Sequence, residues 1–196
     1  MKILRIDASA RYENSVSRQL TDELIGKLKE QHTDIEVVVR DVAKGLPFVD
    51  EAMVSAYNTP AEDRTEAQKE LLQPSNDLVK EIQSADDVLI IGCPIYNFSV
   101  PAALKAYIDL VARAGLTFTY SSEGPKGLLR DRKTYLIITS GGTPVGSEID
   151  YTSGYLKHVL SFLGITNVEI FAADSLSRTG SEKLNQVQKQ IADIVL

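Results

Sequence analysis

The fold is decided by the stretch Val88-Leu89-Ile90-Ile91-Gly92-Cys93-Pro94-Ile95-Tyr96-Asn97-Phe98-Ser99-Val100-Pro101. It begins with a continuous apolar run, which is typical of a strand covered on both faces by other parts of the protein. It continues with a loop that carries two aromatic residues, and it ends on a proline in a position that favours the first turn of a helix. The stretch therefore predicts a buried parallel strand that leads through a loop into a helix.

The same alternation extends in both directions along the chain. Apolar runs of strand length occur at 3–6, 35–39, 134–139 and 167–171, and helical patterns occur at 17–28, 102–113, 155–163 and 181–195, with Ser181 as an expected N-cap. Strands that alternate with helices form a parallel sheet between helical layers. We therefore expect an α/β fold of the flavodoxin-like type, a five-stranded parallel sheet in the order 2-1-3-4-5 with helices on both faces. In this order, ligands bind beyond the carboxyl ends of the strands.

Length, charge and cysteine content indicate a single-domain protein that binds neither nucleic acid nor membranes. The 196 residues fit a single domain over 1–196, and the net charge of −6 is spread along the chain without a basic patch. No stretch approaches the roughly 18 apolar residues that span a membrane. The only cysteine, Cys93, permits no internal disulfide and is expected to be a small buried residue. We expect a cytoplasmic protein with no nucleic-acid or membrane partner.

The segment 41–73 is the main irregularity of the pattern. It contains Pro47 and Pro60 and the start of a charged helix near Thr65. A connection of this length in a compact domain usually covers an active site or contacts a partner.

Three loops carry the functional argument, because each follows a predicted strand and all three open at the same edge of the sheet. The first loop contains Ser9, Ser15, Val16 and Ser17 and leads directly into a helix. A helix start with nearby hydroxyl donors binds phosphate, and a loop poor in glycine suits a terminal monophosphate such as that of FMN. The loop matches neither the dinucleotide fingerprint nor the P-loop. Ser15 or Ser17 could instead serve only as a helix N-cap.

The second loop carries Ile95, Tyr96, Asn97 and Phe98 after the buried strand. Aromatic residues exposed at the end of a strand suit a flat ring, which would lie against Tyr96 and Phe98, although ordinary packing is the alternative.

The third loop is Ser140-Gly141-Gly142-Thr143, directly after another buried strand. Paired glycines allow the backbone to approach a ligand closely, and their N–H groups can face a carbonyl oxygen or a ring nitrogen. A tight turn without a ligand is the alternative. Because all three loops lie at one edge, a flavin site explains them better than a helix cap, ordinary packing and a tight turn that occur there independently.

Few other residues point to chemistry. The two histidines, His32 and His158, stand in or beside helical stretches, and the pair Asp86-Asp87 precedes a strand at the edge opposite the three loops. We therefore expect no metal and no nucleophilic or acid–base side chain, so that the reaction depends on the flavin.

Several blocks carry a resemblance to a known family. They are Pro94–Phe98, Asp109–Phe118, Tyr120, Gly124–Leu128 and Phe162–Thr166. On these blocks the chain resembles, from end to end, the FMN-dependent NADH:quinone oxidoreductases of bacteria, also called FMN-dependent NADH-azoreductases. The third loop lacks the histidine that some members carry shortly after the glycines.

The resemblance implies a site and an assembly. Ser9 and Ser15–Ser17 would bind the phosphate and ribityl end of FMN, Ile95–Phe98 would border the isoalloxazine, and Ser140–Thr143 would face its pyrimidine side. Members of the family are homodimers with flavin sites where the subunits meet. Tyr120 and Phe162 would line the substrate pocket.

These expectations combine into a function. The chain would transfer two electrons from NADH or NADPH through bound FMN to quinones, and would cleave aromatic azo compounds, by a ping-pong mechanism. The alternative is a flavodoxin-type FMN electron carrier, which shares the fold and the cofactor but does not oxidise a nicotinamide. A response-regulator receiver is disfavoured, because Ala8-Ser9 and Gly92–Pro94 stand where it needs acidic residues.

Overall fold

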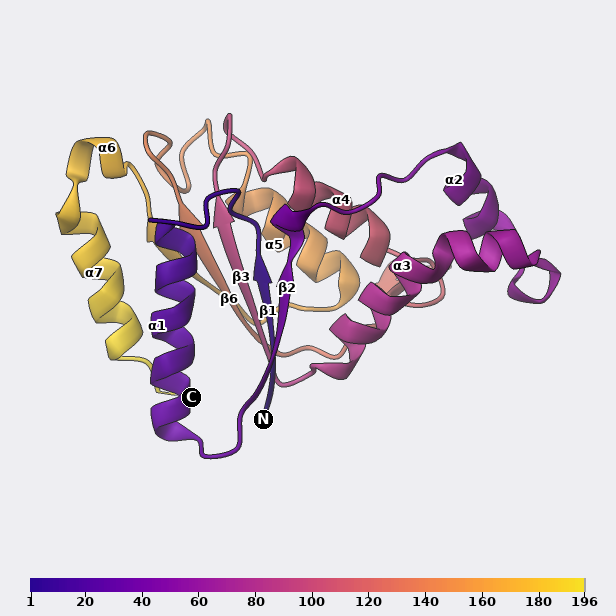
Figure 1. The fold of residues 1–196 in the computed structure, drawn as a ribbon, viewed down its shortest axis with the longest axis horizontal. Coiled ribbons are helices and arrows are strands. Elements are labelled where there is room, and N and C mark those ends of the chain that lie inside the picture. Colours follow the sequence, from indigo (N-terminus) through magenta and orange to yellow (C-terminus); the bar gives the residue numbers. More distant parts are fainter. Residues whose placement is uncertain (196) are drawn as a thin grey trace.

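A central parallel sheet organises the computed structural model, which describes residues 1–195, so that residue 196 of the predicted domain lies outside the described residues. The strands are β1 (Lys2–Asp7), β2 (Glu36–Asp41), β3 (Val88–Pro94), β6 (Lys133–Thr139) and β7 (Val168–Ala173). Their order is β2-β1-β3-β6-β7, and every neighbouring pair is parallel (Figure 1). This confirms the predicted flavodoxin-like sheet, because β6 and β7 are its fourth and fifth strands.

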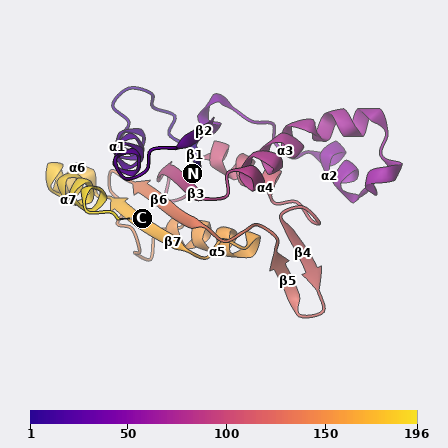
Figure 2. The same cartoon turned by 90° about the horizontal axis from the view of Figure 1, so that it is seen from below.

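Helices cover both faces of the sheet (Figure 2). The helices α1 (Val16–Gln31) and α7 (Ser181–Ala192) lie on one face, whereas α3 (Glu66–Ser84), α4 (Ala102–Val111) and α5 (Ser153–Leu163) lie on the other. The pleat of β3 divides its side chains between the two cores: Leu89 and Ile91 face the α4 and α5 side, and Val88 and Ile90 face the α1 and α7 side. This double burial explains the continuous apolar run.

The segment 41–73 is helical over much of its length. It holds a short turn at Val42–Lys44, the helix α2 (Glu51–Asn58), a second turn at Ala61–Asp63 and the start of α3. Figure 1 shows that α2 and the first half of α3 extend away from the sheet. The helix α2 has only eight residues, too few for apolar spacing alone to identify it as a helix. Its clearest local feature is the N-cap residue Asp50, whose side chain accepts a hydrogen bond from the Met53 N–H at 2.8 Å.

A small hairpin was not expected from the sequence. Its strands are β4 (Phe118–Ser121) and β5 (Gly124–Gly127), which pair antiparallel beside the main sheet (Figure 2). Each strand has only four residues, too few for a clear alternation of apolar and polar positions. Gly127 anchors the hairpin on the end of α5, where a Cβ atom would come within 2.1 Å of the Gly164 nitrogen.

The boundaries of most predicted elements agree within a few residues, with one error at a helix cap. A short helix, α6 (Leu176–Thr179), precedes α7, and Gly180 with a φ of 55° is the N-cap of α7. The prediction of Ser181 as N-cap was wrong, because the sharp turn between the two helices requires the conformation that glycine adopts freely. No helix within residues 1–195 is long and apolar enough to cross a membrane.

Candidate functional site

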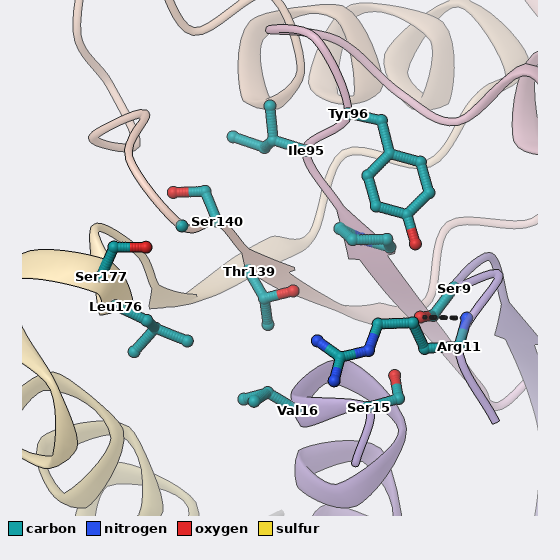
Figure 3. Close-up of a pocket in the computed structure, with 12 residues that line it drawn as sticks. Ser9, Arg11, Ser15, Val16, Ile95, Tyr96, Thr139, Ser140, Leu176 and Ser177 are labelled. Carbon is teal, nitrogen blue, oxygen red and sulfur yellow. Dashed lines mark hydrogen bonds between the residues drawn. The ribbon is translucent and has the colours of Figure 1, made fainter. Parts of the chain in front are cut away.

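A cavity of about 370 Å³ opens at the carboxyl ends of β1, β3 and β6 (Figure 3). This volume lies within the usual range for small-molecule sites. The lining residues come from the three predicted loops and from α6: Ser9, Arg11, Ser15, Val16, Pro94, Ile95, Tyr96, Thr139, Ser140, Gly141, Leu176 and Ser177. The topology thus brings all three loops to one site, as the sheet order predicts.

The first loop leaves the start of α1 open. Ser15 is the N-cap residue, yet its side chain makes no capping hydrogen bond, and its hydroxyl lies 3.4 Å from that of Ser17. The Ser9 hydroxyl, also buried, accepts a hydrogen bond from the Arg11 N–H at 3.2 Å. The first N–H groups of α1 therefore have no side-chain acceptor and carry the positive end of the helix dipole, which suits an anion.

Arg18, in the first turn of α1, fixes the backbone of the first loop. Its guanidinium donates to the Ser9 carbonyl at 2.8 Å and to the Arg11 carbonyl at 3.1 Å. The same group pairs with Asp41 at 2.8 Å and with Asp7 at 3.3 Å. Burial raises the pKa of Asp7 despite the attraction of the neighbouring arginines. The loop is thus fixed through its backbone, and its hydroxyls are left for a ligand.

The second loop is a tight turn with an unusual backbone. Tyr96 and Ser99 exchange backbone hydrogen bonds at 3.0 and 3.2 Å, and the two residues between them, Asn97 and Phe98, have φ values of 49° and 73°. Positive φ at both central positions is the geometry of a type I′ turn, and for Phe it costs about 1–3 kcal/mol. The turn exposes Phe98 and directs the Tyr96 hydroxyl to the Ala10 N–H, 3.2 Å away in the first loop.

The third loop is joined to the segment after β7. The Ser140 hydroxyl donates to the Thr143 carbonyl and accepts from the Ser175 N–H at 3.1 Å. The Ser177 N–H donates to the Gly141 carbonyl at 2.9 Å. A Cβ atom on Gly141 would stand 3.1 Å from the Ser177 hydroxyl, so this position favours glycine.

A second, larger hollow adjoins the first across the Tyr96 ring. It measures about 910 Å³ and is lined by Asn97, Pro101, Lys105, Tyr151 and Tyr155, among others. The Tyr151 N–H donates to the Phe98 carbonyl at 3.0 Å, so the segment just before α5 supports the strained turn. A cavity lined by several serine residues therefore lies beside a larger hollow lined by tyrosine residues.

The predicted cofactor-binding residues divide into three groups. Seven line the cavity: Ser9, Ser15, Val16, Ile95, Tyr96, Ser140 and Gly141. Asn97 lines the adjoining hollow, and the other four, which are Ser17, Phe98, Gly142 and Thr143, line neither.

The structure adds lining residues that sequence reasoning missed, notably Arg11, Thr139, Leu176 and Ser177. Figure 3 shows the Arg11 guanidinium extending toward the space between Thr139 and Val16. The signal for Leu176 and Ser177 was available, because they follow β7, whose carboxyl end reaches the same edge of the sheet.

Tyr120 and Phe162 do not line the cavity of their own chain. Tyr120 stands on the hairpin with 71% of its surface exposed, and Phe162 is half-buried on α5. The Phe118 ring joins them, with centroids 5.5 Å from Tyr120 and 4.5 Å from Phe162. The three rings form one aromatic cluster at the hairpin.

Cys93, Asp86 and Asp87 have structural rather than catalytic surroundings. No group of three or more His, Cys, Asp or Glu residues within 1–195 could hold a metal ion. Burial raises the pKa of the Cys93 thiol well above its ordinary value, so it is a poor nucleophile. Asp87 accepts the Lys2 N–H at 2.7 Å, and Asp86 pairs with Arg130 at 2.8 Å, both at the edge opposite the cavity.

Comparison with known proteins agrees with this geometry. Residues 1–195 match a family described as having a flavodoxin-like fold. The chain is 48% identical over 191 residues to an FMN-dependent NADH:quinone oxidoreductase of Hahella chejuensis, covering 97% of this chain and 93% of the relative. It is 52% identical over 174 residues to one of Jannaschia sp., covering 89% and 88%.

Solved structures give the same result. An azoreductase of Bacillus anthracis is 29% identical with a TM-score of 0.88, covering 98% of this chain and 97% of that one. A FMN-dependent NADH-azoreductase of Bacillus anthracis in complex with FMN is 25% identical with a TM-score of 0.88, covering 98% and 96%. The chain belongs to the FMN-dependent NADH:quinone oxidoreductase family, within the flavodoxin-like fold.

Proposed function

We propose that this protein is an FMN-dependent oxidoreductase that transfers two electrons from NADH to quinones and reductively cleaves aromatic azo compounds. The observation that carries the proposal is the uncapped start of α1, which faces a cavity with buried serine hydroxyls on one side and the Tyr96 ring on the other. An anionic end and a flat ring are the two parts of FMN, and the residues present fit both.

The phosphate and ribityl end would be held by the first loop. Ser9 and Ser15 supply hydroxyls at the cavity, and the Ser17 hydroxyl lies 3.4 Å behind that of Ser15. Val16 supplies an apolar contact, and Arg11 extends a positive charge toward the cavity. Arg18 keeps the loop in place through the Ser9 and Arg11 carbonyls. The phosphate would therefore bind without a change in the loop backbone, because the donors are already oriented.

The ring would be held by the other two loops. Ile95–Phe98 would border it on one side, and Ser140–Thr143 would face its polar edge, where the N–H groups of Gly141 and Gly142 could donate, since the Ser140 N–H already donates to the Ala173 carbonyl at 3.2 Å. FMN, when bound, accepts a hydride and passes on two electrons, and nicotinamide and acceptor would use the same exposed face in turn. The Tyr96–Ser99 turn keeps the Phe98 ring exposed next to Tyr96 in the chain, and an incoming ring would stack against it.

We further propose a homodimer with the flavin sites at the interface. Exposed apolar side chains gather around the hairpin, where Tyr120, Leu116 and Leu128 are 71%, 39% and 44% exposed. Such a patch is typical of an interaction surface. Tyr120 and Phe162 would then complete the substrate pocket of the partner. The single domain over 1–196 and the reducing, cytoplasmic compartment remain predictions, the second supported by the buried single cysteine.

Steady-state kinetics with purified, FMN-loaded protein test the proposal. NADH should bleach the yellow protein, a quinone should restore the colour, and initial rates should give the parallel reciprocal plots of a ping-pong mechanism. A flavodoxin-type carrier would bind FMN but would not turn over NADH with a free acceptor. A protein that cannot be loaded with FMN would contradict both readings.

A further inference from the structure

A third cavity lies between α2, the end of α4 and the start of the hairpin, and it shares no lining residue with the cavity assigned to FMN or with the adjoining hollow. It measures about 380 Å³, and its lining includes Tyr57, Asn58, Arg64, Arg113, Leu116 and Phe118. Figure 2 shows the enclosing elements at the end of the molecule where the hairpin projects. We call it the arginine cavity, because two arginines and no acidic residue line it.

Arg113 is a buried cation without a carboxylate. It is 5% exposed, its guanidinium lies 4.1 Å above the Tyr57 ring centroid, and it donates to the Ser75 hydroxyl at 2.5 Å and to the Asn76 side-chain oxygen at 3.4 Å. Burial lowers its pKa, and the nearby Arg64 acts in the same direction. A buried charge without an opposite charge is costly, so this position favours a bound anion.

Arg64 adds a second cation to the same cavity. Its Nε–H donates to the Ala56 and Thr59 carbonyls at 3.0 and 3.1 Å, which orients the planar head. Within residues 1–195 the arginines that form ion pairs are Arg5, Arg18, Arg40 and Arg130. Arg64 and Arg113 are thus uncompensated in a chain whose net charge is −6.

The rest of the lining is apolar and aromatic. Leu116 and Phe118 form one wall, and Phe118 contacts Tyr120 and Phe162, the pair proposed to complete a flavin site. Inorganic phosphate would make no favourable contact with this apolar wall. An aromatic molecule with an acidic group would contact both the wall and the two arginines.

We propose that the arginine cavity binds the carboxylate or sulfonate of an aromatic electron acceptor, with Arg64 and Arg113 as its anion receptor. The inference rests on the proposed function, including the second subunit whose flavin site Tyr120 and Phe162 would complete. It makes acidic quinones and azo compounds the preferred acceptors, because the planar guanidinium matches carboxylate and sulfonate oxygens.

Calorimetric titration of the FMN-loaded protein with naphthalene-2-sulfonate tests binding without electron transfer. We expect binding to the native protein and a loss of affinity of about tenfold or more in Arg64→Gln, since hydrogen bonds to charged groups are involved. Arg130→Gln changes an exposed arginine that pairs with Asp86 and does not line the arginine cavity, and it should leave the affinity unchanged. If Arg113→Gln does not fold, Arg64→Gln decides the question alone. Equal affinity in Arg64→Gln, or equally tight binding of inorganic phosphate, would overturn the proposal.

Kinetics then connect the site to the reaction. In Arg64→Gln the KM for a sulfonated naphthoquinone should rise by about tenfold, whereas the KM for the uncharged naphthoquinone and kcat for both should not change. A parallel rise for both quinones would contradict the proposal. Absence of NADH oxidation with the uncharged quinone in the native protein would instead contradict the proposed function, so the two failures are distinguishable.

Discussion

Two helix starts in this chain are built differently. At α3, Thr65 accepts the Gln68 N–H at 3.2 Å while the Gln68 side chain accepts the Thr65 N–H at 3.0 Å, a complete capping box. At α1, Ser15 occupies the N-cap but makes no capping bond. The first start satisfies its own N–H groups, and the second leaves them for a ligand. The difference between the two starts is that the one at the cavity keeps its N–H groups available, whereas the one away from the cavity does not.

The largest expected effect is on cofactor binding at the open start. Ser15→Ala should weaken FMN binding by about tenfold or more, because a hydroxyl that donates to a charged phosphate is lost. The stability of the FMN-free protein should hardly change, since Ser15 makes no capping bond. Fluorescence titration of FMN and urea denaturation measure the two quantities. An unchanged FMN affinity would remove Ser15 from the site.

At the capped start of α3, we expect a substitution to lower stability and to leave FMN affinity unchanged. Thr65→Ala should lower the free energy of unfolding by about 1 kcal/mol, because a capping bond is lost. FMN affinity should stay as in the native protein. Thr65→Ser is the matched control, since it keeps the hydroxyl and should restore the stability in urea denaturation. A loss of FMN affinity in Thr65→Ala would break the distinction between the two helix starts.

The strained turn of the second loop gives a third test. Phe98→Gly should stabilise the FMN-free protein by up to about 1 kcal/mol, because glycine adopts positive φ without strain. It should also reduce the rate with quinones, since the exposed ring is lost. Phe48, which is 72% exposed, lies outside the residues with positive φ, so Phe48→Gly should not stabilise the protein. Thermal unfolding of the two variants separates strain relief from loss of an exposed ring.

The smallest effect is expected at the amino edge of the sheet. Hydrogen bonds from the Thr166 hydroxyl, the Thr166 N–H and the Asn167 N–H hold the pKa of Asp131 at about 2. Because the folded pKa lies below the ordinary value of 3.8, the stabilisation is present above that value and is lost as the pH falls toward about 2. Asp131→Asn should therefore be slightly less stable near neutral pH and should converge with the native protein in acid. Urea denaturation against pH measures this, and a constant difference at all pH values would contradict it.

Much of the fold and part of the site could be predicted from local pattern. The apolar run at 88–92 and the alternation around it predict the sheet order, because parallel strands buried on both faces allow few arrangements. Since carboxyl ends of such strands share one edge, the loops at Ser9, Ile95 and Ser140 could be assigned to one site. The missed elements, which are α2, the hairpin and α6, are too short to carry a clear periodic signal.

The sequence by itself therefore determined the fold class, the edge that holds the cavity and the family of the chain. Only the tertiary structure decided that Ser15 leaves α1 uncapped, that Asn97 and Phe98 adopt positive φ, and that Arg113 is buried beside Arg64 without a carboxylate. The physical reason is that alternation of strands and helices is a local property of the chain. Whether a hydroxyl or a guanidinium finds a partner depends instead on residues far away in the sequence.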